Sequence, residues 1–473
     1  MLFNSIQFLI FFVVVTTAYF AIPQRFRWFL LLGASCVFYA AFIPVYILIL
    51  FGTIVVDYIA GIKIEHASGR RRKSFLILSL VANIGVLAVF KYYNFFIENI
   101  NYFLQQLHIK AGGLAYLSIA LPIGLSFHTF QAMSYTIEVY RGHVPAERHF
   151  GIYALYVMFY PQLVAGPIER PQAILYQFYE EKSFDFERVV TGLERILWGL
   201  FKKVVVSDLL SIYVNSIYNH HEANTGFTLL VATYAFAFQI YCDFSGYSDI
   251  ALGTAQVMGF KLMENFNLPY FSKSITEFWR RWHISLSSWL RDYLYISLGG
   301  NRKGLFKTYR NLMITMLLGG LWHGASWNFV IWGFLNGAYL SIEKWLSLEA
   351  KGGADYKLAH KVARTFITFN LICLTWIFFR ASSFTQAIYI VTNIFNPVRF
   401  WNLRIQDTGI FSSMVLGVVI LLSFEYYYLR KHSIAQITPK LGWYRPMAFS
   451  IVLVLLIIGF GVSGNDQFIY FQF

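Results

Sequence analysis

Apolar residues along this chain form long continuous blocks and do not alternate with polar residues at every second position. The clearest blocks cover residues 6–22, 28–60, 75–90, 117–139, 227–244, 366–379, 410–422 and 447–462. A helix that crosses the hydrocarbon core of a bilayer needs about 20 residues, and most of these blocks approach or exceed that length. The block 28–60 is long enough for two segments that bend at Pro44. The pattern predicts an all-α polytopic membrane protein with about 10–12 transmembrane or re-entrant helices.

Composition agrees with this class. Of the 473 residues, 57% are hydrophobic and 13% are charged, whereas soluble domains carry about 25% charged residues. A soluble enzyme of this length would divide into domains joined by polar linkers, and the sequence contains no such linker. We therefore predict a single membrane domain over residues 1–473, with its core motifs in 121–340 and its C-terminal helices in 360–473.

The formal charge of +14, from 38 basic and 24 acidic residues, is unevenly distributed. Basic residues cluster in short loops at 70–73 and 302–310, which the positive-inside rule places in the cytoplasm. The loop 218–225 lacks such a cluster and is predicted to lie outside. Nucleic-acid binding would need a basic patch on a soluble face, so we expect no nucleic-acid partner. The first apolar block lacks a basic flank and a cleavage site, which favours a retained helix over a signal peptide.

Metal and thiol chemistry find little support in the sequence. The three cysteines, Cys36, Cys242 and Cys373, lie far apart in apolar surroundings and form no pair with ligand spacing. His220 and His221 are adjacent and precede Glu222, but no further ligand follows nearby, and a solvated loop explains them better. We expect no metal site.

Polar residues within apolar blocks are candidates for an internal site, because they are costly on a lipid-facing helix. Three stretches concentrate them, at 121–135, 238–253 and 278–336. The function is expected to reside there.

The segment 278–300 reads FWRRWHISLSSWLRDYLYISLGG. At about 100° per residue it has an apolar stripe opposite a basic face, which predicts one amphipathic helix in the membrane interface with its aromatic edge among the acyl chains. His283 falls at the border of the two faces, beside Trp279 and Leu290. It is either an ordinary interfacial residue or part of a site. The stripe contains Phe278, Trp282, Leu286, Trp289 and Tyr293, and the opposite face contains Arg280, Arg281, Ser288, Arg291 and Asp292.

The segment 311–339 begins beside the basic cluster that ends at Arg310. A helix rising 1.5 Å per residue would carry His323 roughly 18 Å from that cluster, near the middle of the bilayer. Glycines at 319, 320 and 324 allow close backbone approach and helix breaks around this histidine. Burial would keep the imidazole neutral, as a general base requires. A histidine bonded to a backbone carbonyl in a helix bundle is the equally weighted alternative.

Asp243 and Asp249 lie within or beside another apolar helix. Their separation of six residues does not place them on one helical face, so we do not expect an acid/base pair of carboxylates. Asp243 either forms a polar seam with Gln239 and Tyr247 or serves as a helix cap or an interhelical hydrogen-bond partner.

Four motifs carry a resemblance to a known family. They are QLVAGPIER (162–170), DFSGYSDIA (243–251), the segment 278–300 and LWHGASWNFVIWG (321–333). In order and spacing they are similar to the membrane-bound O-acyltransferase family, specifically its bacterial branch of alginate and peptidoglycan O-acetylating enzymes. The resemblance covers nearly the whole chain and is least distinctive in the last roughly 100 residues.

The resemblance implies a ring of tilted helices around a central tunnel, with interfacial amphipathic helices. It implies His323 as the catalytic histidine and His283 as the second histidine of the site. No cofactor is expected to be bound, because acetyl-coenzyme A would act as the acyl donor, arriving from the cytoplasm. The supporting residues would be Asp243, Trp279, Trp322, Trp327 and Asn328, and the donor-binding candidates Arg280, Arg281, Arg302 and Lys303. Contact with lipid headgroups explains these four cations equally well.

The resemblance further implies a multi-pass protein of the bacterial cytoplasmic (inner) membrane that passes an acyl group, acetyl above all, across the bilayer. The group would be destined for O-acetylation of a cell-envelope polysaccharide, either an alginate-like exopolysaccharide or peptidoglycan. A separate acetyltransferase of the SGNH type outside the membrane is the expected partner. D-alanyl or other acyl transfer to teichoic acid remains an alternative. A polysaccharide transporter or flippase is another, although it should contain internal repeats that this sequence lacks.

Overall fold

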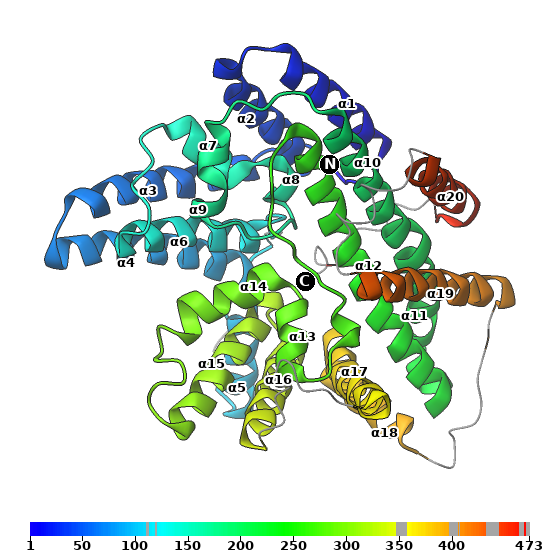
Figure 1. Cartoon of the computed structure of the whole chain (residues 1–473). Coiled ribbons are helices and arrows are strands. Elements are labelled where there is room, and N and C mark those ends of the chain that lie inside the picture. Colours follow the sequence, from blue (N-terminus) through cyan, green and yellow to red (C-terminus); the bar gives the residue numbers. More distant parts are fainter. Residues whose placement is uncertain are drawn as a thin grey trace. The chain divides into compact units, whose positions relative to one another are not determined.

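The computed structural model describes residues 1–109, 113–118, 121–346, 357–396, 405, 407–431, 444–462 and 468–469. In these ranges all regular secondary structure is helical, as Figure 1 shows. The predicted all-α class is therefore confirmed. The remaining parts of the predicted C-terminal range 360–473 lie outside the described residues.

Several helices are long and apolar enough to cross a membrane. Among the described residues these are α3 (Tyr46–His66), the continuous segment Gly69–Gln106, α12 (Gly226–Met258), α17 (Leu358–Arg380) and Thr408–Tyr427 of α19 (Thr408–Lys431). The segment Gly69–Gln106 consists of α4 (Gly69–Leu87), the π-helix η1 (Ala88–Tyr92) and α5 (Tyr93–Gln106). Two shorter apolar helices are α1 (Ile6–Ala21) and residues Met447–Phe460 of α20 (Tyr444–Phe460). The protein is thus a multi-pass membrane protein.

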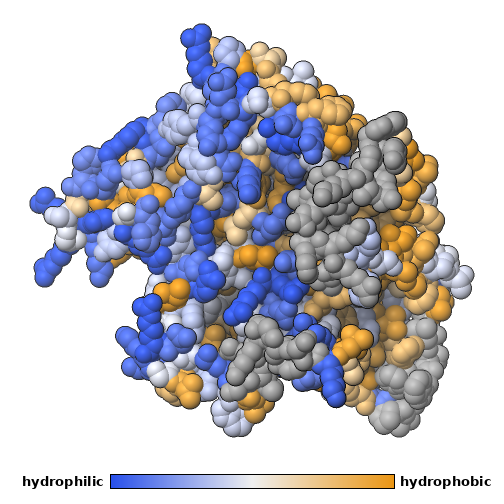
Figure 2. Space-filling model, viewed as in Figure 1, coloured by the Kyte–Doolittle hydropathy of each residue, from blue (hydrophilic) through white to orange (hydrophobic). Residues whose placement is uncertain are grey.

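The surfaces of these helices are suited to lipid. On α20, the side chains of Ile451, Leu455 and Ile458 are exposed, and Figure 2 shows hydrophobic residues over this helix at the right of the view. The tip of the α3–α4 hairpin, at the left of Figures 1 and 2, is hydrophilic instead, and Arg70 and Arg71 are exposed there. This contrast is expected where a basic loop leaves the membrane.

The apolar block 28–60 forms two helices, as predicted. The first is α2 (Gln24–Ala40) and the second is α3, and Pro44 lies in the turn between them. Proline lacks a backbone N–H and cannot sit inside a helix without breaking its hydrogen bonds.

The chain divides into two compact units. Unit 1 contains residues 1–192 and 251–263, and unit 2 contains 193–250 and 264–473. The helices α10 (Phe186–Leu200) and α12 contribute residues to both units. The single-domain organisation stays a prediction. Unit 1 further contains α6 (Leu125–Arg141), α7 (Phe150–Met158), α8 (Tyr160–Leu163), α9 (Pro171–Ile174) and the 3-10 helix η2 (Leu175–Phe178).

A buried polar cluster joins three helices of unit 1. Asp57 on α3 accepts hydrogen bonds from Ser79 (2.6 Å) and from the amide of Asn83 (2.8 and 2.9 Å), both on α4. Ser79 also lies 2.9 Å from the hydroxyl of Thr136 on α6. Because lipid supplies no hydrogen bonds, such groups must be satisfied inside the protein. The cluster therefore links α3, α4 and α6 side by side.

Unit 2 contains the segments in which function is expected. It begins with the end of α10, the π-helix η3 (Phe201–Ser207) and α11 (Asp208–Tyr218), followed by most of α12. The later elements are α13 (Ile275–Arg281), α14 (Ile284–Trp289), the π-helix η6 (Leu290–Tyr295), α15 (Leu305–His323), α16 (Trp327–Trp345), α17, α18 (Phe384–Ile394), α19 and α20, with the short 3-10 helices η4 (His221–Ala223) and η5 (Pro269–Phe271) between them.

The prediction of one continuous helix over 278–300 is wrong. The chain instead forms α13, turns at His283, and continues as α14 and η6. His283 has a φ of 42°, in the left-handed region, so the helix cannot continue through it. The stripe residues Phe278, Trp282 and Leu286 are buried in the protein and do not face acyl chains. Periodicity identified the apolar face correctly but could not distinguish a protein core from lipid.

The segment 311–339 forms a helical hairpin. Helix α15 ends at His323, and α16 begins three residues after Gly324. Gly320 packs against the backbone of Phe329 and Gly333 so closely that a side chain at either glycine would collide with carbonyl oxygens of the partner helix. The two glycines allow this backbone-to-backbone contact, which places His323 at the tip of the hairpin.

Gly333→Ala tests this contact. The added methyl group would overlap the Met316 carbonyl oxygen, and overpacking of this kind costs about 1–3 kcal/mol. We expect a lower midpoint of thermal unfolding in detergent. Gly85→Ala on α4 is the control, because no atom lies within 4 Å of its added methyl group. Equal midpoints for the two variants would contradict the packing described.

Candidate active site

The two motif histidines lie in one buried aromatic cluster of unit 2. His283 is 0% exposed, in the turn between α13 and α14, and His323 is 4% exposed, at the end of α15. The Trp322 ring contacts both, with centroid distances of 6.0 Å to His283 and 4.9 Å to His323. Residues 40 positions apart in the sequence are thus brought against one indole ring.

Aromatic side chains from two further helices surround His323. Its ring centroid lies 5.0 Å from Trp332 and 6.4 Å from Phe329, both on α16, and 5.2 Å from Phe379 on α17. All three aromatic residues are buried. Such surroundings exclude water and strengthen electrostatic interactions with a reacting group.

His283 lies outside the five candidate membrane spans, and burial lowers its imidazole pKa to about 3. The ring is therefore neutral near pH 7, with one nitrogen that donates and one that accepts. The Phe244 ring packs edge-on against it, at 4.6 Å between centroids. Phe468 in turn packs against Phe244 at 5.4 Å, so a segment near the C-terminus takes part in the surroundings of His283.

The other aromatic and amide candidates occupy different environments. Trp279 is half-buried and packs edge-on against Trp332, with the ring centroids 5.6 Å apart. Trp327 is 57% exposed at the start of α16. Asn328 is buried, and its amide donates to the Ala381 carbonyl at 2.8 Å. One of the two amide N–H donors of Asn328 therefore bonds the backbone, whereas Trp279 borders the cluster around His323.

The basic candidates are mostly at the surface of unit 2. Arg280, Arg302 and Lys303 are exposed. Arg281 is half-buried and forms an ion pair with Glu277 at 2.7 Å, one helical turn earlier. The charge of Arg281 is thus compensated within the protein, which leaves the three exposed cations better suited to an external anion.

Asp243 is buried on α12 and holds two partners from distant parts of the chain. Its carboxylate forms an ion pair with Lys203 at 2.7 Å and accepts the Ile469 backbone N–H at 2.7 Å. Lys203 also pairs with Asp208 at 2.8 Å. The polar group that Asp243 organises is thus centred on a lysine of η3 and not on the predicted seam with Gln239 and Tyr247.

Asp249 belongs to a neighbouring ion-pair group, in which Lys202 is buried and Glu264 is exposed. It pairs with Lys202 and, at 3.0 Å, with Arg195, and Arg195 also binds Glu264. The amine of Lys202 donates to Ser245 on α12 at 2.9 Å. Asp243 and Asp249 thus have separate cations, in agreement with the expectation that they are not a carboxylate pair.

The close approach of α10 and α12 makes these pairs geometrically accessible. A Cβ on Gly199 would lie 2.6 Å from the Gly246 carbonyl oxygen, and one on Gly246 would lie 2.7 Å from that of Gly199.

Sequence analysis missed Lys202 and Lys203. Their signal was a pair of cations flanked by apolar residues, LWGLFKKVVV, which is as unusual in a membrane protein as a buried acid.

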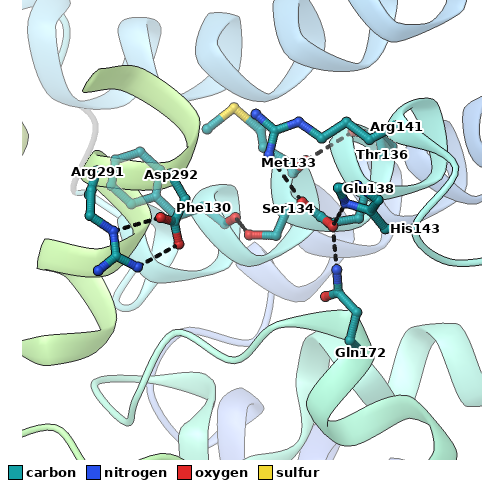
Figure 3. A network of polar contacts seen from close by, with 10 residues as sticks. All are labelled: Phe130, Met133, Ser134, Thr136, Glu138, Arg141, His143, Gln172, Arg291 and Asp292. Atoms are coloured by element: carbon teal, nitrogen blue, oxygen red, sulfur yellow. Dashed lines mark hydrogen bonds and ion pairs between the residues drawn. The ribbon is translucent and has the colours of Figure 1, made fainter. Parts of the chain in front are cut away.

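The motif QLVAGPIER lies in unit 1, where Glu169 is fully buried between α8 and α9. Its carboxylate accepts the Met263 backbone N–H at 2.6 Å. Nearby, Glu138 at the end of α6 binds Arg141, His143 and Gln172, the last from α9, as Figure 3 shows. The motif is thus bonded to residue 263, and α9, which follows the motif directly, is bonded to α6. Both contacts support a structural role for the motif within unit 1.

Replacing Lys202 tests the buried ion pairs. Lys202→Met would leave Asp249 with Arg195 alone, and breaking a buried pair costs about 3–5 kcal/mol. We expect a clear decrease in the thermal unfolding midpoint. The added change Asp249→Asn removes the unpaired carboxylate and should reverse at least half of that decrease. Lys73→Met, at an exposed position, should leave the midpoint unchanged. A Lys202→Met protein as stable as Lys73→Met would exclude this role of Lys202.

Glu169 predicts a pH dependence of stability. Burial raises its carboxyl pKa to about 7 from an ordinary 4.5, although the Met263 N–H and the Arg170 charge oppose the shift. A raised folded-state pKa stabilises the fold below the unfolded-state pKa, and that stabilisation is lost as the pH rises through 7. Glu169→Gln keeps the acceptor for Met263 and should remove this part of the decline in thermal midpoint between pH 5 and 8. A decline identical to that of the wild type would show that Glu169 does not titrate in this range.

The chain is similar in sequence to known proteins over most of its length. The model of the family described as "MBOAT, membrane-bound O-acyltransferase family" matches residues 143–348, which include all four motifs. The chain is 38% identical over 497 aligned residues to "Probable alginate O-acetylase AlgI" of Pseudomonas putida, with 100% of both chains covered. It is 41% identical to the protein of that name from Pseudomonas aeruginosa, covering 89% of this chain and 80% of the relative.

Another relative is the "Peptidoglycan O-acetyltransferase" of Helicobacter pylori, 32% identical, with 93% of this chain and 90% of the relative covered. Identity at this level over nearly complete chains, together with the family match, shows that this chain shares the fold and the enzyme class of these relatives. The chain belongs to the membrane-bound O-acyltransferase family and is an acyltransferase.

Proposed function

We propose that this protein takes an acetyl group from acetyl-coenzyme A at the cytoplasmic face of the bacterial inner membrane. It passes the group across the bilayer for O-acetylation of a cell-envelope polysaccharide. The observation that supports this most directly is the burial of His283 and His323 against the same side chain, Trp322. A scaffold helix bundle has no need for two buried histidines in one aromatic cluster.

In the proposed reaction His323 is the general base. Its imidazole accepts the proton of an acceptor hydroxyl as the hydroxyl oxygen attacks the thioester carbonyl of the donor. The tetrahedral intermediate then collapses, the C–S bond breaks, and the proton returns from His323 to the leaving thiolate. A positioned general base contributes about 10²–10⁴ in rate, and alignment of two substrates in a confined site adds to it.

The oxyanion of the intermediate needs hydrogen-bond donors. Trp322 and the backbone N–H groups beside Gly324 are suitably close to His323 in the chain. The Gly324 N–H makes only a long bond of 3.4 Å, to Gly320, so redirecting it costs little. Trp327 is a further candidate, and Asn328 has one amide N–H left after its bond to the Ala381 carbonyl. His283 is assigned to holding one of the reacting groups beside Trp322.

Donor binding is assigned to the exposed cations. Arg280, Arg302 and Lys303 are exposed, and the sequence 302–310 is the strongest cytoplasmic signal in unit 2. The phosphates of a coenzyme A thioester are attracted by such a cluster. Arg281 would contribute less, because Glu277 already neutralises it.

The acceptor is proposed to be an alginate-like exopolysaccharide or peptidoglycan, because relatives named for each cover nearly the whole chain. A separate acetyltransferase of the SGNH type outside the membrane would complete the transfer to the polymer. D-alanyl transfer to teichoic acid is less well supported. The "Teichoic acid D-alanyltransferase" of Streptococcus thermophilus is 30% identical to this chain, and the match covers 54% of this chain.

Replacing His323 tests the proposed chemistry. We expect His323→Ala to lower acetyl transfer by about 10²–10⁴-fold, the contribution of a general base. The measurement is the release of free coenzyme A from acetyl-coenzyme A by purified protein in nanodiscs, with oligomannuronate or peptidoglycan fragments as acceptors.

The matched control is His220→Ala, a histidine in an exposed loop, which should retain wild-type rates. D-alanyl thioester in place of acetyl-coenzyme A distinguishes the teichoic-acid alternative. Wild-type rates of coenzyme A release by folded His323→Ala would overturn the assignment of the base.

A further inference from the structure

We propose that Asn265 is a positioning residue that fixes the tautomer and orientation of His283, leaving its Nε2 as the hydrogen-bond acceptor. Asn265 lies in none of the four family motifs. The inference rests on the proposed function of the site, and it adds a residue on which the chemistry of His283 depends.

Asn265 holds the turn that contains His283 through both its backbone and its side chain. Its carbonyl oxygen accepts the Ile284 N–H at 2.9 Å, and two residues later the Asn267 N–H donates to the Arg281 carbonyl at 2.9 Å. The chain 265–267 therefore runs along the turn 281–285. These bonds hold His283 in its left-handed conformation, which is costly for a residue other than glycine.

The orientation of the Asn265 amide follows from its neighbours. The Ser285 backbone N–H, which can only donate, lies 3.2 Å from Asn265 Oδ1, and the Ser285 hydroxyl donates to the same oxygen at 2.9 Å. On the other side Asn265 Nδ2 donates to the Ser248 hydroxyl at 3.3 Å. An inverted amide would direct its NH₂ group at the Ser285 N–H. The oxygen of the amide therefore faces the histidine.

The amide orientation determines the imidazole. His283 Nδ1 lies 3.1 Å from Asn265 Oδ1, and an amide oxygen can only accept a hydrogen bond. Nδ1 must therefore carry the proton in the neutral ring, so the lone pair resides on Nε2. This is the logic by which an outer partner sets the tautomer of a functional histidine.

Burial strengthens the argument. Asn265, His283 and Ser285 are each at most 1% exposed, so water does not compete for these bonds. The Arg281 guanidinium also donates to the Asn267 carbonyl in this turn, at 3.3 Å, and its charge is compensated by Glu277. The partner of His283 Nδ1 is a neutral amide, which keeps His283 neutral. Ser248 belongs to the DFSGYSD motif of α12, so Asn265 connects that motif to the histidine of α13–α14.

The test compares two replacements of Asn265. Asn265→Ala removes the hydrogen-bond acceptor of His283 Nδ1, and loss of such a partner lowers activity by about 10–100-fold. We expect this loss to appear in kcat. The KM for acetyl-coenzyme A should stay within about twofold of wild type. Asn265→Asp keeps an oxygen opposite Nδ1 but adds a negative charge that stabilises the imidazolium. Its activity should be partly restored at pH 8–9, and the acid limb of its kcat profile should move to higher pH by at least about one unit.

Asn224→Ala is the control, because Asn224 is similarly buried but donates to backbone carbonyls of its own loop; its kcat profile should match that of the wild type. A purely structural role of Asn265 predicts equal losses of activity in Asn265→Ala and Asn265→Asp at every pH, and that result would overturn the proposal.

A second measurement does not depend on turnover. In protein labelled with ¹⁵N-histidine, the signal lost in His283→Ala should report a protonated Nδ1.

A protonated Nε2 in the wild type would overturn the inference even if acetyl transfer by His323 is confirmed. Conversely, absence of acetyl transfer together with a protonated Nδ1 would reject the proposed function while the tautomer assignment stands.

Discussion

Lys202 and Lys203 stand at consecutive positions of η3, and the arrangement of unit 2 depends on compensating their two buried charges. A π-helix directs neighbouring side chains differently from an α-helix, and here one lysine reaches Asp249 and the other Asp243 on α12. The pairs form only because Gly199 and Gly246 let α10 approach α12 backbone to backbone. Unpaired, each ion would carry a desolvation penalty of several kcal/mol. The same helix α12 then presents Phe244 and Ser248 to the segment that holds His283, so the ion pairs and the site share one framework.

The sequence was sufficient for the class of fold and for the two histidines, because both follow from local patterns. The length of an apolar block indicates whether a helix can span the bilayer, and Pro44 in the middle of the block 28–60 indicates a break between two helices. The motifs around His283 and His323 identify the family through residue type and spacing alone. Gly319, Gly320 and Gly324 indicated a close approach, although the helical hairpin itself was visible only in the structure.

What the sequence could not supply depends on contacts between distant residues. The amphipathic pattern of 278–300 has the same period whether its apolar face meets lipid or protein, so the burial of Trp282 and Leu286 was not predictable. Nothing local indicates that His283 adopts a left-handed conformation, because the hydrogen bonds that hold it come from Asn265, 18 residues earlier. Nothing local indicates that one of the two amide N–H donors of Asn328 bonds the Ala381 carbonyl, 53 residues later.

The bond from the Ile469 N–H to Asp243 joins residues 226 positions apart, and Phe468 packs beside it on Phe244. During synthesis, α12 and both histidines leave the ribosome long before this partner exists. Until residue 469 has been synthesised, Asp243 has Lys203 as its ion-pair partner but lacks the Ile469 N–H, and almost half of the chain has still to be made. The surroundings of His283 are completed last, which couples the acquisition of a finished site to the insertion of the final helices into the membrane.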